Sequence, residues 1–141
     1  TGRLRLGFET LTSIGPDSLR AARMAAALGE QGRLWEFVEL IYRNQGAENT
    51  SYVTDRYLSA LADAIPGVDL ARALRERDSP AVQAQISLAR AQARAFGVQS
   101  TPSFLLSGPH TPPRRFAPAD LSSESFARAL DRALAGRSVS G

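Results

Sequence analysis

The Ser-Thr-Pro-Ser stretch at residues 100–103 constrains the fold of this chain most, because it separates a long helical pattern from a short apolar run. Upstream of it, apolar residues recur at helical spacing until Gly97, a residue that commonly ends a helix. Downstream, the Phe-Leu-Leu run at 104–106 is typical of a buried strand. Proline cannot donate a hydrogen bond within a β-ladder, so Pro102 belongs at the start or the edge of that strand. The sequence therefore predicts a helix, a proline turn and a strand in this order.

The composition is that of one ordinary globular domain. With 141 residues, of which 43% are hydrophobic, the chain is long enough to bury a core. All 17 basic residues are arginines, they are scattered among 14 acidic residues, and Arg114-Arg115 is their only adjacent pair. Nucleic-acid binding would need a clustered basic stripe with interleaved aromatic residues. We therefore predict no nucleic-acid partner.

Hydrophobic periodicity predicts a chain that is mainly helical. Alternation of Leu4, Leu6 and Phe8 with polar residues and glycine indicates a first strand. We expect Thr54 or Asp55 to cap one helix, and Leu121 to pack on Phe126 at the start of the last one. The expected order is a strand at 3–9, helices at 17–29, 34–45, 54–65, 69–77 and 80–96, strands at 103–107 and 115–117, and a helix from 122.

The order of these elements resembles that of the DsbA-like thiol–disulfide oxidoreductases, which have a thioredoxin fold with a helical insertion. Several short segments carry the same resemblance in the order of that family: Gly15-Pro16-Asp17-Ser18, Gly29-Glu30-Gln31-Gly32, Ile41-Tyr42-Arg43-Asn44-Gln45-Gly46, Ala95-Phe96-Gly97-Val98 and Ser100-Thr101-Pro102-Ser103-Phe104. The resemblance implies an α/β fold, a thioredoxin-like sheet with an all-helical insertion at about 17–96. It covers one domain that spans residues 1–141.

The resemblance also implies that part of the domain precedes this sequence. In that family the fold opens with a strand that leads to a Cys-x-x-Cys pair at the start of the first helix. A strand–helix–strand unit takes about 30 residues or more. We therefore expect a domain that is incomplete at its N-terminus, either a fragment or a domain completed by another segment.

The resemblance assigns substrate binding to Ser100, Thr101 and Pro102. It implies that the backbone of Thr101 pairs with an extended substrate segment and that a cis Thr101–Pro102 bond shapes the surface beside the active-site sulfurs. The chain has no cysteine. A thiolate is the nucleophile of disulfide exchange and a serine hydroxyl forms no disulfide, so we expect no catalytic residue in these 141 residues.

The same resemblance implies the partners of the intact protein. These are cysteine-containing protein substrates and a redox partner protein, with a strand-completing segment or a second copy of the chain as a further contact. No metal and no organic cofactor are implied. The localisation implied is extracytoplasmic.

Aromatic residues and the single histidine have ordinary structural interpretations. Trp35, Phe37 and Tyr42 could line a peptide groove, but aromatic residues at helical spacing are typical of packing. His110 lies in a turn rich in glycine and proline, and no second metal-ligating residue type clusters near it in the sequence. We therefore expect His110 to be exposed and without a catalytic role.

The acidic candidates are interpreted in the same way. Helix capping explains Asp17-Ser18 without a catalytic dyad. Glu36 and Glu39 are three residues apart on an amphipathic helix and Glu30 precedes it, so a solvated face is the simpler interpretation. The sequence does not identify a buried acid that could relay protons.

Two alternatives to a thiol–disulfide oxidoreductase stay open at this point. One is a redox-inactive thioredoxin-like module that holds extended peptides at the Thr101–Pro102 edge. The other is a glutathione-using enzyme of the kappa-class transferase type, which shares the fold and the helical insertion. The sequence upstream of Thr1 distinguishes them, since Cys-x-x-Cys supports the oxidoreductase, no cysteine the binding module, and a lone serine or cysteine the transferase.

Overall fold

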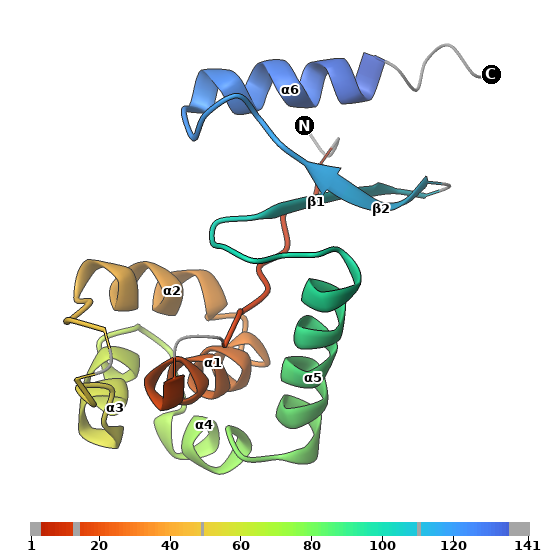
Figure 1. The fold of residues 1–141 in the computed structure, drawn as a ribbon. Coiled ribbons are helices and arrows are strands. Elements are labelled where there is room, and N and C mark those ends of the chain that lie inside the picture. Colours follow the sequence, from red (N-terminus) through yellow and green to blue (C-terminus); the bar gives the residue numbers. More distant parts are fainter. Residues whose placement is uncertain (1–3, 13–14, 49, 110, 136–141) are drawn as a thin grey trace. The chain divides into compact units, whose positions relative to one another are not determined.

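The computed structural model describes residues 4–12, 15–48, 50–109 and 111–135. Within these residues the chain forms helices and one antiparallel strand pair, and it divides into two compact units, Thr1–Arg94 and Ala95–Gly141 (Figure 1). The elements are α1 (Gly15–Gly29), α2 (Leu34–Arg43), α3 (Asp55–Asp63), α4 (Leu70–Glu76), α5 (Pro80–Ala95), β1 (Phe104–Gly108), β2 (Thr111–Phe116) and α6 (Ser123–Ala135).

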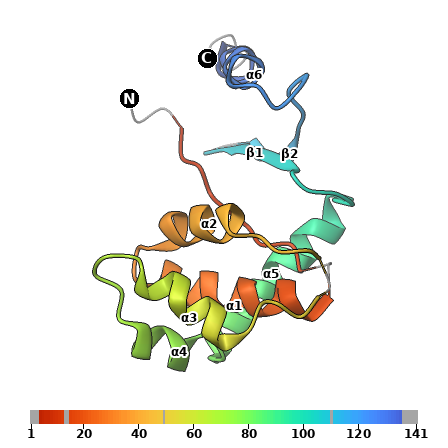
Figure 2. The same ribbon diagram turned by 90° about the vertical axis from the view of Figure 1, so that its left-hand side faces the viewer.

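The N-terminal unit is built around α1, which contacts α2, α3 and α4 (Figure 2). Small side chains on α1 allow these helices to approach closely, and Met24 and Leu28 are fully buried among them. The other helices contribute Phe37, Leu58, Val82 and Ile86 to a continuous hydrophobic core, and the turn after α3 contributes Ile65. This burial is the main source of stability for the unit.

Side-chain caps fix where three of these helices begin. The Thr54 hydroxyl accepts a hydrogen bond from the Tyr57 amide at 3.1 Å, as the sequence predicts. Asp69 accepts from the Arg72 amide at 2.8 Å at the start of α4. Ser79 accepts from the Val82 amide at 3.3 Å at the start of α5. Each cap satisfies an amide that has no partner within its own helix.

The C-terminal unit is a β-hairpin with a helix that packs on it. β1 and β2 pair antiparallel, with Phe104 opposite Phe116. The ring of Phe126 on α6 lies 4.8 Å from that of Phe104 and 6.2 Å from that of Phe116, measured between centroids. The expected packing of Leu121 at the start of α6 is wrong, because Leu121 is 65% exposed.

The prediction of a strand at 3–9 is wrong for the residues that the structure describes. Residues 4–12 have no regular secondary structure, and the sheet of the described residues contains β1 and β2 alone. Leu4 is 51% and Leu6 68% exposed. Alternation shows which side chains share a face, but a strand also needs a neighbour for its backbone hydrogen bonds, and that neighbour is absent here.

Candidate functional site

Ser100, Thr101 and Pro102, the three residues that the sequence selects, lie together in the loop between α5 and β1. α5 ends at Ala95 and Gly97 has a φ of +60°, a left-handed conformation that favours glycine. The Thr101–Pro102 peptide bond is cis, and both residues are exposed. We call residues 98–103 the proline loop.

Two side-chain contacts hold the proline loop. Ser103 donates a hydrogen bond from its hydroxyl to the carbonyl of Ser100 at 2.6 Å, which closes the loop around Thr101. Before the loop, the Nη1 of Arg115 donates to the carbonyls of Gly97 at 2.9 Å and of Phe96 at 3.4 Å. Hydrogen bonds therefore hold the chain both at Gly97, just before the loop, and at Ser103, its last residue.

The backbone of Thr101 is open to a partner. No hydrogen bond to its amide or carbonyl is present within the described residues, and the β-ladder begins three residues later, at Phe104 opposite Phe116. Exposed backbone groups that have no partner can pair with an added peptide strand. The loop presents backbone groups without a partner among the described residues, and it contains no thiol.

Glu9, in the N-terminal unit, is an acidic residue that sequence reasoning missed. Glu9 is exposed as a whole, but partial burial of its carboxyl group raises the pKa of Glu9. Its neighbours line a small cavity with it: Phe8, Thr10, Ala25, Ala26, Leu34, Gln85 and Ile86. The only signal in the sequence is its position next to Phe8 in an alternating apolar run.

The aromatic candidates differ in their surroundings. Phe37 is fully buried, as the packing interpretation predicts. Trp35 is 46% exposed and lies edge-on to Phe8, with 5.9 Å between ring centroids. Tyr42 is 62% exposed, so packing does not explain it.

The polar candidates are not brought together into a catalytic arrangement. Glu36 pairs with Arg33 at 3.3 Å and Glu39 pairs with Arg43, both on the solvated face of α2. Ser18 donates to the carbonyl of Gly15 at 2.8 Å. His110 lies outside the described residues.

Asp17 is buried in the first turn of α1, where its negative charge suits the helix dipole. Its carboxylate lies 3.7 Å from the guanidinium of Arg20. Over the described ranges, no three His, Cys, Asp or Glu side chains are grouped as a metal site would require. None of the described helices is both long enough and apolar enough to cross a membrane.

Comparison with known proteins gives consistent results. The DSBA-like thioredoxin domain family matches residues 2–131. A probable disulfide bond formation protein D of Bacillus cereus is 28% identical over 110 residues, which cover 76% of this chain and 51% of that protein. The crystal structure of a thioredoxin-like oxidoreductase from Silicibacter pomeroyi matches with a TM-score of 0.64 and 25% identity, over 86% of this chain and 63% of the other.

A third match is to a much larger protein. The Na⁺/H⁺ antiporter NhaA of Herminiimonas arsenicoxydans is 31% identical over 88 residues, which are 62% of this chain and 13% of the antiporter. This chain thus spans about half the length of the disulfide bond formation protein and a small part of the antiporter.

Proposed function

Because the chain belongs to the DSBA-like thioredoxin domain family, we propose that it is the substrate-contacting part of a thiol–disulfide oxidoreductase. The observation that supports this most directly is the exposed proline loop, in which the backbone of Thr101 has no partner within the described residues. The thiols would come from a cysteine-bearing segment outside these 141 residues, since the sequence has none.

The reaction exchanges one disulfide for another. A thiolate of the cysteine-bearing segment attacks one sulfur of a disulfide, forms a mixed disulfide with it and releases the other sulfur as a thiolate. A second thiolate of the same segment then attacks the segment's own sulfur in the mixed disulfide, which forms a disulfide within the segment and releases the remaining substrate sulfur as a thiolate. In this scheme the proline loop binds the extended backbone of the substrate and holds its sulfur in line for attack. Orientation of this kind lowers the barrier by fixing the reacting atoms in advance.

The partners in this proposal are cysteine-containing protein substrates and a redox partner that restores the thiols or the disulfide. Exchange needs no metal and no organic cofactor, because the sulfurs carry the electrons. An extracytoplasmic location fits this function, since disulfides persist in oxidising compartments. The Bacillus cereus relative, described as a probable disulfide bond formation protein, supports the same assignment.

An oxidation assay on three proteins tests the proposal. The first is the 141-residue chain, the second is the same chain extended by the segment that its gene encodes upstream of Thr1, and the third is that longer protein with each cysteine changed to serine. We expect only the second to oxidise a dithiol peptide or reduce insulin. Turnover by the cysteine-free chain, or an upstream segment without cysteine, would contradict the proposal.

The absence of cysteine favours a second candidate, a redox-inactive module that binds extended peptides. The same open backbone of Thr101 would serve it. The two candidates share the binding step and differ in chemistry. A longer natural protein that binds a peptide at Thr101 but has no turnover would support this second candidate against the first.

A further inference from the structure

Arg115 joins the two ends of the proline loop. On β2 it lies opposite Leu105, three residues after Pro102, so it belongs to the strand pair that follows the loop. Its guanidinium donates to the carbonyls of Gly97 and Phe96, which precede the loop. One residue therefore links the chain before the loop to the sheet after it.

The end of a helix is a suitable place for this contact. The last carbonyls of a helix have no donor within the helix, and the helix dipole places partial negative charge there. A guanidinium supplies both a positive charge and several donors in a fixed geometry. Phe96 and Gly97 follow directly on α5, where Gly97 has turned the backbone to a φ of +60°. Arg115 donates hydrogen bonds to two backbone carbonyls that this turn leaves without a donor.

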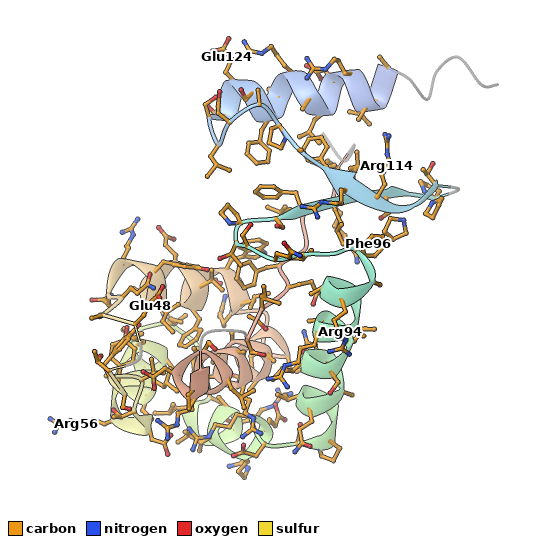
Figure 3. The ribbon with its side chains drawn as sticks, viewed as in Figure 1. Glu48, Arg56, Arg94, Phe96, Arg114 and Glu124 are labelled. Atoms are coloured by element: carbon orange, nitrogen blue, oxygen red, sulfur yellow. The ribbon has the colours of Figure 1, made fainter. Side chains whose placement is uncertain are left out.

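The neighbouring Arg114 shows that the contact is specific to one position. Arg114 lies opposite Leu106 in the ladder, and successive side chains on a strand point to opposite faces. Its side chain makes no hydrogen bond within the described part of the chain, and the residue is exposed on β2 (Figure 3). The adjacent arginine pair thus supplies a test residue and a matched control of equal size and charge.

We propose that Arg115 is a positioning residue that holds the proline loop in the shape that an extended peptide pairs with. Without the guanidinium, the Gly97 end of the loop would be free to move while the Phe104 end stays in the ladder. The hydrogen bond from Ser103 to Ser100 would then close a loop whose entry is no longer fixed. The choice of an extended peptide as the ligand rests on the proposed function, whereas the effect on the free loop does not.

Backbone ¹⁵N relaxation of the free 141-residue chain tests the positioning role without a ligand. In Arg115→Ala we expect the order parameters of Ser100 and Thr101 to fall from about 0.85 towards 0.6 or below. In Arg114→Ala they should stay at the wild-type value. Arg115→Lys, which keeps the charge and a donor, should restore most of the order. Equal order parameters in Arg115→Ala and Arg114→Ala would overturn the proposal.

Binding of a short synthetic peptide with one central cysteine, followed by the shift of the Thr101 amide, tests the link to function. We expect Arg115→Ala to weaken binding about tenfold relative to Arg114→Ala, the loss of roughly one charged hydrogen bond. Unchanged affinity in Arg115→Ala would overturn the link to binding and leave the proposed function intact. No binding even by the wild-type chain would count against the proposed function, while the relaxation result would still decide the role of Arg115.

A folding check accompanies both measurements. If Arg115→Ala loses the far-ultraviolet circular dichroism of the wild type, Arg115→Lys and Ser103→Ala replace it. Ser103→Ala removes only the hydrogen bond to the carbonyl of Ser100. A mobile loop in Ser103→Ala together with an ordered loop in Arg115→Lys supports the proposal, and a mobile loop in Arg115→Lys with an intact fold contradicts it.

Discussion

The two units of this chain bury their side chains to very different extents. Among the described residues, all but one of the buried hydrophobic side chains lie between Ala22 and Ala89, in the helical N-terminal unit. The C-terminal unit buries Ala129 and Ser125 and otherwise depends on a cluster of three partly buried phenylalanine rings. A two-stranded sheet is only marginally stable alone, so the stability of this unit depends on few contacts.

This contrast separates the source of stability from the place of binding. The proline loop belongs to the weakly packed unit, where α5 has ended and the ladder has not yet begun. Segments with few buried contacts open most easily, and binding loops are commonly drawn from them. Local hydrogen bonds from Arg115 and Ser103 therefore matter more here than they would in a dense core.

The largest expected effect comes from opening the core of the helical unit. Phe37→Ala removes a side chain that is fully buried in α2 and leaves a cavity. We expect the free energy of unfolding to fall by about 3–5 kcal/mol. Urea titration followed by circular dichroism measures it, with Leu88→Ala, at a position that is 58% exposed, as the control. A loss below about 1 kcal/mol would show that the core is less tightly packed than its burial indicates.

A smaller but more selective effect is expected from Phe126→Ala. Phe126 contacts both Phe104 and Phe116, so its removal takes away the ring that joins α6 to the two strands. We expect a loss of about 2 kcal/mol that is confined to the C-terminal unit. Amide hydrogen exchange should rise over residues 104–135 and stay unchanged in α1. The control is Leu121→Ala at the 65% exposed position, and a uniform rise over both units would contradict the prediction that the loss is confined to the C-terminal unit.

The sequence predicted the helices well because their signals are local. Thr54, one of the two expected cap residues, caps α3, and Gly97 follows the end of α5 as expected. The predicted strand at 3–9 failed because pairing depends on a neighbour that no local pattern specifies. Alternation of apolar and polar residues near the N-terminus therefore predicts secondary structure less reliably than a helix-cap residue does.

The same distinction applies to the site. Ser100, Thr101 and Pro102 are adjacent in the chain, so the sequence could select them together. Arg115 was not selected, because the carbonyls that it contacts lie 18 and 19 residues earlier and belong to the backbone. Only the register of β1 and β2 brings it there. Glu9 was missed for a related reason, since its pKa depends on side chains from α1, α2 and α5.

A modest, pH-dependent effect is expected from the ion pair between Arg77 and Asp55 in the helical unit, whose atoms lie 2.7 and 2.8 Å apart. The hydrogen bonds from Arg77 hold the pKa of Asp55 below its usual value. Because the folded-state pKa is depressed, the stabilisation is present above the unfolded-state pKa and disappears as the pH falls through the folded-state pKa.

Asp55→Asn measures this contribution. Solvent screens an aspartate that is 68% exposed, so we expect the variant to lose less than about 1 kcal/mol at neutral pH and nothing near pH 2. Asp63→Asn, on the last residue of α3, is the control for the loss of one charge. A difference that persists unchanged at about pH 2 would show that the ion pair is not its cause.

The smallest expected effect has the opposite sign and comes from Glu9. Its raised pKa means that the folded chain binds a proton at Glu9 more tightly than the unfolded chain. The favourable contribution is fully present below the unfolded-state pKa and disappears as the pH rises through the folded-state pKa, so at neutral pH the partly desolvated charge of Glu9 destabilises the helical unit. Glu9→Gln should match the wild type near pH 3 and be slightly more stable at neutral pH, because solvent screens most of the charge on an exposed residue. Glu48→Gln, in an exposed loop of the same unit (Figure 3), is the matched control for one lost negative charge. Equal pH profiles for the two variants would mean that the cavity around Glu9 does not distinguish its protonated from its ionised form.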